Sequence, residues 1–361
     1  MSPLLVLLVA LPLLGGLLAA LTGPAREQLA GRVGTALTGV AFLLGVLLAA
    51  AVLADGPVSA VFERADGRAV GGLYADRLSA VLVLLVCAVS GVVQAFAQRY
   101  LRADPRAGRF FAATGLLTAA TLALVTSATL IGLAIAWSLA GLALLALLGL
   151  YAELPAAREG VRRTARAFAL GDLALWAAVV VALFTWGNLD LRSLGAQLPR
   201  IADDELALAV VACGLVIAAL ARSAQLPFGR WLPATLAAPT PVSALLHAGV
   251  VNAGGVLLVR LAPLFGASQV ATHLAFAAGA ATALYGTSLM LVKPDVKGGL
   301  AHSTMGQMGF MIMVCGLGAF AAVIFHLVAH GMYKATLFLG SGAAVGGHVR
   351  HAKAPPATDL T

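Results

Sequence analysis

Three titratable side chains recur at regular spacing inside an apolar segment near the end of the chain. His326, His330 and Lys334 occupy positions i, i+4 and i+8 of the run HLVAHGMYK. On a helix these residues share one face, because four residues turn only about 40° past a full turn. Neighbouring groups would lie about 6 Å apart along the axis, a separation that one water molecule can bridge.

The chemistry of these three groups suits proton transfer. Imidazole titrates near neutral pH, and a lysine removed from water can also lose its proton. The spacing of His326, His330 and Lys334 therefore predicts a stepwise proton path along one helix. The alternative is that two histidines pack in a helix bundle while the lysine extends to the membrane surface.

Other ionisable residues also interrupt apolar segments, where an unpaired charge costs about 2.5–3.5 kcal/mol or more. Asp172, Arg222 and His247 are such residues, and His302 is a second-tier candidate for a relay. Lys297 is expected at the cytoplasmic mouth of the path, or equally as an ordinary basic residue of a cytoplasmic loop. The chain has no metal-binding or nucleotide-binding motif, so no cofactor of its own is expected.

Four prolines follow Arg222 and predict a break in a helix that would otherwise continue to about residue 236. They are Pro227, Pro233, Pro239 and Pro241. Each proline lacks a backbone donor and obstructs helix continuation. Irregular backbone at membrane depth is tolerated where protein buries it or water reaches it, and transporters place ion sites at such breaks. The alternative is a proline-rich loop at the membrane surface.

The composition is that of a membrane protein with many helices. Of its 361 residues, 61% are hydrophobic and only 11% are charged, and the mean hydropathy is +0.98. Soluble domains carry about 25% charged residues, which excludes that class. Apolar runs long enough to cross a bilayer predict about eleven spans. Their approximate bounds are 3–22, 33–54, 78–98, 109–127, 128–150, 167–187, 205–223, 241–262, 268–292, 299–316 and 318–345.

The charged loops alternate in sign along the chain. Basic loops join spans 1 to 2, 3 to 4, 5 to 6 and 9 to 10, whereas acidic residues gather at 55–76 and 190–205. Because basic loops stay in the cytoplasm, the N-terminus is predicted outside and the C-terminus inside. The tail from His348 is short and polar, and we expect it to be disordered.

Three motifs in this order resemble the antiporter-like subunits of respiratory complex I and of Mrp sodium/proton antiporters. The motifs are PTPVSALLHAG, LVKPDVKGGLAHSTMGQMGFM and FHLVAHGMYKATLFLGSG, and the resemblance covers most of the chain from about Asp76. It implies an all-α inverted-repeat fold with a discontinuous helix near 222–236. The implied parts are helices 1–3 in 1–108, a first five-helix repeat in 109–262, a partial second repeat in 263–347 and a polar tail in 348–361.

Within this family, ARSAQLPF, HAGVVNAGG and HGMYKATLFLGSG are most similar to the DabB-type membrane subunit of bacterial inorganic-carbon accumulation systems. This resemblance implies an inner-membrane proton-conducting subunit that pairs with a large zinc-containing, carbonic-anhydrase-like partner. By the same resemblance, Asp172, Arg222 and His247 join the residues of the last span on the proton path. One alternative is a proton-pumping subunit of an NADH-quinone oxidoreductase or an Mrp antiporter. Another is a membrane anchor for a soluble enzyme that conducts nothing.

Two departures from the family pattern affect these expectations. The family has Trp-Glu where this chain reads Trp137-Ser138, and it has lysine where this chain has Arg222. Arginine does not deprotonate in proteins, so Arg222 is expected to be a fixed positive charge that Asp172 balances. The second repeat also looks incomplete, so the chain is a short variant or a fragment, or a partner completes it.

Overall fold

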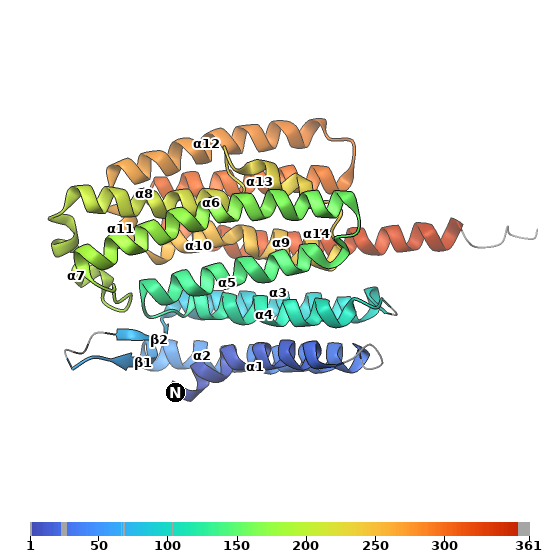
Figure 1. Cartoon of the computed structure of the whole chain (residues 1–361), viewed down its shortest axis with the longest axis horizontal. Helices are drawn as coiled ribbons and strands as arrows, with labels where there is room; N and C mark the ends of the chain where they lie inside the picture. Colours follow the sequence, from blue (N-terminus) through green and yellow to red (C-terminus); the bar gives the residue numbers. More distant parts are fainter. Residues whose placement is uncertain (1, 23–26, 66, 68, 103, 353–361) are drawn as a thin grey trace, which may run out of the picture.

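The protein is an antiparallel bundle of long helices (Figure 1). The structure, a computed structural model, describes residues 2–22, 27–65, 67, 69–102 and 104–352. The helices are α1 (Ser2–Leu21), α2 (Glu27–Asp55), α3 (Arg77–Tyr100), α4 (Ala107–Val125), α5 (Leu130–Leu148), α6 (Pro155–Trp186), α7 (Leu194–Ala202), α8 (Glu205–Arg222), α9 (Thr240–Ala248), α10 (Ala253–Arg260), α11 (Ala262–Gly266), α12 (Gln269–Val292), α13 (Val296–Gly316) and α14 (Phe320–Ala352). Short 3₁₀ helices are η2 (Gly149–Tyr151), η3 (Gly229–Thr235) and η4 (Val250–Asn252).

Ten helices among the described residues are long and apolar enough to cross a membrane. One of them is the interrupted stretch Thr240–Arg260, which contains α9, η4 and α10. The tenth predicted span, 299–316, forms α13, which has the necessary length but is less apolar than the others. The all-α membrane fold predicted from the sequence is therefore confirmed, with ten apolar spans plus α13.

Glycines allow α12 and α13 to pack backbone against backbone. A Cβ atom at Gly286 would lie 2.5 Å from the backbone nitrogen of Gly306, and one at Gly316 would lie 2.6 Å from that of Phe276. Side chains cannot fit at such separations, so small residues along both helices permit the contact. The protein, rather than lipid, covers much of α13, which explains why its polar residues are tolerated in the bundle.

Side-chain caps fix the beginning of several spans. In each case a side-chain oxygen accepts a hydrogen bond from a backbone N–H in the first turn, which otherwise has no partner. The caps are Asp76 of α3, Thr129 of α5, Asp204 of α8, Ser268 of α12 and Asp295 of α13. Proline begins α6 at Pro155, where a missing N–H costs nothing.

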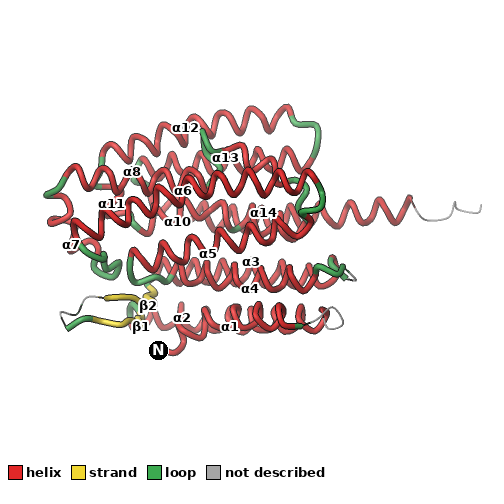
Figure 2. The backbone as a smooth tube through the Cα atoms, viewed as in Figure 1, coloured by secondary structure: helices red, strands yellow, loops and turns green. Residues whose placement is uncertain are grey.

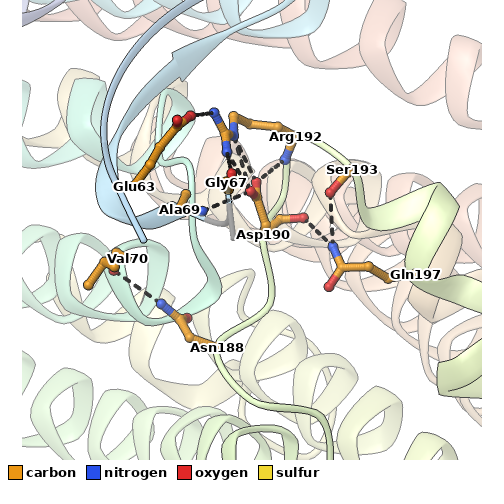
Figure 3. A network of polar contacts seen from close by, with 9 residues as sticks. All are labelled: Glu63, Gly67, Ala69, Val70, Asn188, Asp190, Arg192, Ser193 and Gln197. Atoms are coloured by element: carbon orange, nitrogen blue, oxygen red, sulfur yellow. Dashed lines mark hydrogen bonds and ion pairs between the residues drawn. The ribbon is translucent and has the colours of Figure 1, made fainter. Parts of the chain in front are cut away.

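A two-stranded hairpin, which the sequence analysis did not predict, lies at the end of the bundle that holds α7 (Figure 2). Strand β1 (Val58–Glu63) pairs antiparallel with β2 (Ala69–Ala75). Figure 3 shows how the loop after α6 holds the hairpin. Asp190 accepts hydrogen bonds from the backbone N–H of Ala69 at 3.1 Å and from Arg192 at 2.8 Å. Arg192 also donates to Glu63 at 2.6 Å, so one arginine joins the loop to β1.

The contact between the hairpin and the loop after α6 depends on pH, because Asp190 is ionisable. Burial acts to raise the pKa of Asp190, but hydrogen bonds from Arg192 and from the Ala69 N–H together lower it below its ordinary value. Because the pKa of Asp190 is lower in the folded protein, the ionised carboxylate stabilises the hairpin fully above the ordinary aspartate pKa of about 3.9. This stabilisation is lost as the pH falls through the lower pKa that Asp190 has in the folded protein.

We therefore expect the hairpin to loosen in acid below about pH 4 and to be intact at pH 7. Hydrogen exchange at the Ala69 amide, whose acceptor is Asp190, measures this directly. The Asp190→Asn variant should show faster exchange already at neutral pH, whereas Asp203→Asn, an exposed acid nearby in sequence, should not. Equal protection of Ala69 in wild type and Asp190→Asn at pH 7 would contradict this assignment.

The predicted grouping of the loops by charge agrees with the fold. Arg106 of the 3–4 loop donates a hydrogen bond to Glu153 of the 5–6 loop, and Tyr151 donates one to Asp104. These loops and the α12–α13 connection lie at one end, whereas the hairpin and α7 lie at the other (Figure 1). Which end faces the cytoplasm stays a prediction. The predicted tail, 348–361, begins inside α14, and residues 353–361 lie outside the described residues.

Candidate functional site

The predicted helix break occurs directly after Arg222, the last residue of α8. Ser223, Ala224 and Gln225 are fully buried in the protein, so the break is not a loop at the membrane surface. The chain resumes as the 3₁₀ helix η3, which packs against α6 and α13. The Ser223 hydroxyl donates to the Val251 carbonyl at 2.6 Å. This bond joins the break after α8 to η4, the interruption between α9 and α10.

The four prolines divide between two positions. Pro227 lies in the turn after α8, and Pro233 lies inside η3. Pro239 is the residue before α9, and Pro241 is in its first turn. A proline costs no hydrogen bond at the beginning of a helix. Pro239 and Pro241 therefore begin the next helix, whereas Pro227 and Pro233 lie within the break itself.

Arg222 and Asp172 form the ion pair that the sequence predicted, at 2.8 Å between Nη2 and Oδ1. The guanidinium is buried, and it lies 4.5 Å from the ring centroid of Trp137 and 4.1 Å from that of Phe168. The Trp137 indole N–H donates to the same Asp172 oxygen at 2.9 Å. Ser138, where the family has glutamate, instead accepts a hydrogen bond from Trp176 at 3.1 Å. Two aromatic rings and one carboxylate thus hold Arg222 in place.

Gly141 leaves the space that this guanidinium occupies. A Cβ atom at Gly141 would lie 2.9 Å from Nη2 and 3.0 Å from Nη1 of Arg222. We expect Gly141→Ala to displace the guanidinium and to lower the free energy of unfolding by about 1–3 kcal/mol, the usual cost of overpacking. Thermal unfolding of the purified protein measures this change.

Gly39→Ala in α2 is the matched control for this prediction. Nothing lies within 4 Å of a Cβ atom at Gly39, and a helical glycine replaced by alanine gains helix propensity. This variant should be as stable as wild type or slightly more stable. If Gly141→Ala melts no lower than Gly39→Ala, Arg222 is not held as tightly as its contacts indicate.

His247 is buried at the end of α9, between α13 and α14. Its Nδ1 lies 3.1 Å from the Thr304 hydroxyl oxygen, and its ring stacks on Phe338 with centroids 4.3 Å apart. The Thr304 hydroxyl donates to the Leu300 carbonyl at 2.9 Å. Because its one hydrogen is used there, Thr304 can accept from His247, which favours a proton on Nδ1.

Lys334 of α14 contacts the same turn of α13. It is fully buried, and Nζ donates to the Ser303 hydroxyl at 2.9 Å and to the Leu300 carbonyl at 3.4 Å. The Leu300 carbonyl therefore accepts from both Lys334 and Thr304. Together with the Thr304–His247 contact, this makes a continuous polar chain from Lys334 to His247 across α13.

The two histidines of α14 continue from Lys334 toward the other end of the helix. The His326 and His330 rings are 5.7 Å apart between centroids and nearly parallel, as the spacing of four residues predicts. His330 is buried, and neither of its ring nitrogens has a hydrogen-bond partner among the described residues. The Nε2 atom of His326 also has none in the described chain. Buried imidazole nitrogens without protein partners are places where water completes the hydrogen bonding.

The two secondary candidates make local contacts near the beginning of α13. Lys297 Nζ donates to the carbonyls of Leu236 and Ala238 at 3.4 and 3.3 Å, so it satisfies the backbone that follows η3. His302 is buried, and its Nδ1 lies 2.8 Å from the Gly298 carbonyl of its own helix. Neither Lys297 nor His302 belongs to the polar chain. The α13 residues that do belong to it are sequence neighbours of His302.

The Arg222–Asp172 pair has no direct contact with His247 or Lys334. A cavity of about 80 Å³ lies between α3, α4, α8, α10 and α14, lined by Arg222, Asn252 and Leu327 among others. Ser90 and Thr118, which also line it, are hydrogen bonded to each other at 2.6 Å. The Oδ1 atom of Asn252 has no hydrogen-bond partner within the described part of the chain. Most of the lining is Leu, Val and Ala, and the α14 residue in it is Leu327, so the few polar side chains are the positions at which water can bind in this volume.

Comparison with known proteins places this geometry in a family. Residues 127–354, more than half of the chain, match the model described as "NADH:quinone oxidoreductase/Mrp antiporter, TM". Residues 68–111 match the model described as "NADH-Ubiquinone oxidoreductase (complex I), chain 5 N-terminus". The chain belongs to the NADH:quinone oxidoreductase/Mrp antiporter family of membrane subunits.

Several members of this family resemble the chain over most of its length. It is 44% identical over 279 residues to the probable inorganic carbon transporter subunit DabB1 of Halothiobacillus neapolitanus, which covers 76% of this chain and 50% of that protein. It is 35% identical over 356 residues to the NADH-quinone oxidoreductase subunit L of Mycobacterium tuberculosis, covering 96% of this chain and 56% of that protein. The chain thus spans about half the length of these relatives.

Solved structures of the family share the fold. The Mrp complex from Dietzia sp. superposes with a TM-score of 0.85 at 29% identity, over 98% of this chain and 38% of that one. An archaeal membrane-bound sulfane sulfur reductase gives a TM-score of 0.80 at 21% identity, over 94% of this chain and 70% of that one. Because its identity to this chain is only 21%, the sulfane sulfur reductase shows a shared fold and does not indicate a shared role.

Sequence reasoning missed several polar residues of this antiporter-like site. Ser303, Thr304 and Asn252 contact or adjoin the titratable groups, yet none carries a charge. The available signal was the run His302-Ser303-Thr304, three polar residues in an otherwise apolar segment. Because successive residues turn by 100°, only part of this run can face α9 and α14.

Proposed function

We propose that this chain is a proton-conducting membrane subunit that couples proton flux to the reaction of a partner. The gathering of Lys334 and His247 at one turn of α13 is the observation that supports this proposal most directly: Lys334 and Thr304 both donate to the Leu300 carbonyl, and Thr304 contacts His247. Because a carbonyl oxygen has no proton to pass on, the transfer between Lys334 and His247 itself needs a water molecule. His326 and His330 extend the line on one side of Lys334. Water is needed between the titratable side chains of α14, because the distances between them exceed the length of a hydrogen bond.

The residues divide into two roles. Arg222 keeps its proton, so together with Asp172 it acts as a fixed electrostatic element that sets the potential near the break. His247, His326, His330 and Lys334 exchange protons in turn, because imidazole and a buried amine can both titrate. Lys297 donates a hydrogen bond to a backbone carbonyl and so stabilises the chain at the mouth of the path. No chemistry of this chain calls for a cofactor.

We propose that the partner is a large zinc-containing, carbonic-anhydrase-like subunit and that the flux drives hydration of CO₂. The identity to the DabB1 subunit, which is higher than that to subunit L, supports this choice. Subunit L favours a second candidate, a proton-pumping subunit of an NADH-quinone oxidoreductase, because its match extends over 96% of the chain. The proposed location is a bacterial inner membrane, with the N-terminus outside and the C-terminus in the cytoplasm.

Purification under mild conditions separates these partners. The carbon-uptake proposal predicts that a large zinc protein co-purifies, measured by metal analysis. Flavin and iron–sulfur absorbance in the purified complex would instead support the oxidoreductase candidate.

Proton flux separates conduction from simple anchoring. We expect His330→Ala to reduce flux into vesicles that contain the purified complex by about tenfold or more. His273→Ala removes an exposed histidine of α12 that makes no hydrogen bond or ion pair among the described residues, and it should leave the flux unchanged. A protein that only anchors an enzyme would give no flux in wild type and no difference between the two variants.

A further inference from the structure

A second cavity, remote from the proton path, lies at the basic end of the bundle. It has a volume of about 670 Å³ and lies between the beginning of α2, the end of α3 and the beginning of α4. Arg32, Arg99 and Arg102 line it, together with apolar side chains that include Leu101 and Phe111. Its volume is in the range of sites that bind small molecules.

No side chain that the structure describes supplies a counter-charge to the three arginines. Arg32, Arg99 and Arg102 are exposed, and among the described residues they make no hydrogen bond or ion pair. The neighbouring Arg106, in contrast, pairs with Glu153 and Asp104. Three guanidinium groups around one cavity repel one another, and a bound anion relieves that repulsion.

The surroundings of the cavity point to lipid rather than to a soluble anion. Leu29 and Val92 present exposed apolar side chains on α2 and α3, so lipid borders this part of the bundle. Phe96 and Tyr100 stack at the same end of α3, with ring centroids 5.6 Å apart. Aromatic side chains of this kind gather at the level of lipid headgroups, and basic pockets between spans bind anionic headgroups.

We infer that this cavity binds the phosphodiester of an anionic phospholipid. The guanidinium groups of Arg32, Arg99 and Arg102 form bidentate hydrogen bonds with the phosphate oxygens, a geometry that suits arginine better than lysine. The apolar floor at Leu101 and Phe111 receives the first part of the acyl chains, which continue along the outer face of α2 and α3.

Native mass spectrometry of the full chain in detergent tests this site. Dioleoyl phosphatidylglycerol and dioleoyl phosphatidylcholine are titrated separately, and bound lipid is counted. We expect tighter binding of phosphatidylglycerol, and a loss of about fivefold for each arginine replaced, up to the triple variant R32Q/R99Q/R102Q. Arg166→Gln, an exposed arginine of α6 outside the cavity, is the matched control and should bind as wild type does.

Two further measurements test whether the site recognises the charge of a lipid headgroup. The charge-preserving variant R32K/R99K/R102K should keep a preference for phosphatidylglycerol, although a weaker one than wild type because lysine cannot bind the phosphate in a bidentate way. Such a result shows that lost binding in the glutamine variant reflects charge and not misfolding. Inorganic phosphate should not displace the lipid. The inference is overturned if the two lipids bind equally, if the triple glutamine variant keeps its preference, if the lysine variant loses it, or if phosphate competes.

Discussion

Replacing Lys334 with methionine is expected to reduce proton flux by about 100-fold, to the level of empty vesicles. Lys334 is fully buried, and its ammonium hydrogen bonds to the turn of α13 at Ser303 and Leu300. Methionine keeps the length of the side chain but cannot carry a proton. Flux is measured from the quenching of a pH-sensitive dye after a potassium diffusion potential is applied.

Two further variants show whether exchange of the Lys334 proton is what matters. Lys334→Arg keeps the positive charge, but arginine does not deprotonate, so flux should remain as low as in the methionine variant. Lys293→Gln removes an exposed lysine from the turn between α12 and α13 and should leave flux unchanged. Substantial flux through Lys334→Arg would mean that Lys334 supplies a charge and not a proton.

The second large effect is expected on stability, from Asp172→Asn. This substitution leaves the buried Arg222 without its counter-charge and should lower the free energy of unfolding by about 3–5 kcal/mol. The double variant D172N/R222M should recover most of the loss, because removing both charges of a buried pair is often neutral. Unfolding of the purified protein in mixed micelles, followed by tryptophan fluorescence, gives these values.

The same residues also test the role of Arg222 as a fixed charge. Arg222→Lys restores the lysine that the family has at this position, and a fixed-charge role predicts no gain in flux. Asp203→Asn, an exposed acid before α8, is the control for Asp172→Asn and should change neither stability nor flux. If Arg222→Lys raises transport while Asp172→Asn changes nothing, the pair does not act as proposed.

Features that depend on local spacing could be predicted from the sequence. The stacking of His326 on His330 follows from a separation of four residues on one helix, which needs no knowledge of neighbours. The contact of Asp172 with Arg222 was predictable because two opposite charges in lipid-spanning segments must find partners. The break after Arg222 followed from the prolines, whose effect on the backbone is also local.

Features that depend on which helices meet could not be predicted in this way. Thr304 donates to the carbonyl four residues before it, as Thr118 and Thr164 do elsewhere in the bundle. Only the packing of α9 against α14 beside α13 makes Thr304 a partner of His247. The hairpin was missed because both strands are short, β2 contains two adjacent glycines, and its partner Arg192 is more than a hundred residues away.

The close backbone contact between α12 and α13 has a mechanical consequence for proton transfer. Consecutive residues of α13, Ser303 and Thr304, contact Lys334 of α14 and His247 of α9. Because no flexible side chains lie between α12 and α13, a displacement of α13 moves α12 with it. If the chain conducts protons as proposed, a displacement of α13 would change the Lys334–Ser303 and His247–Thr304 distances together, so the two proton transfers would be coupled.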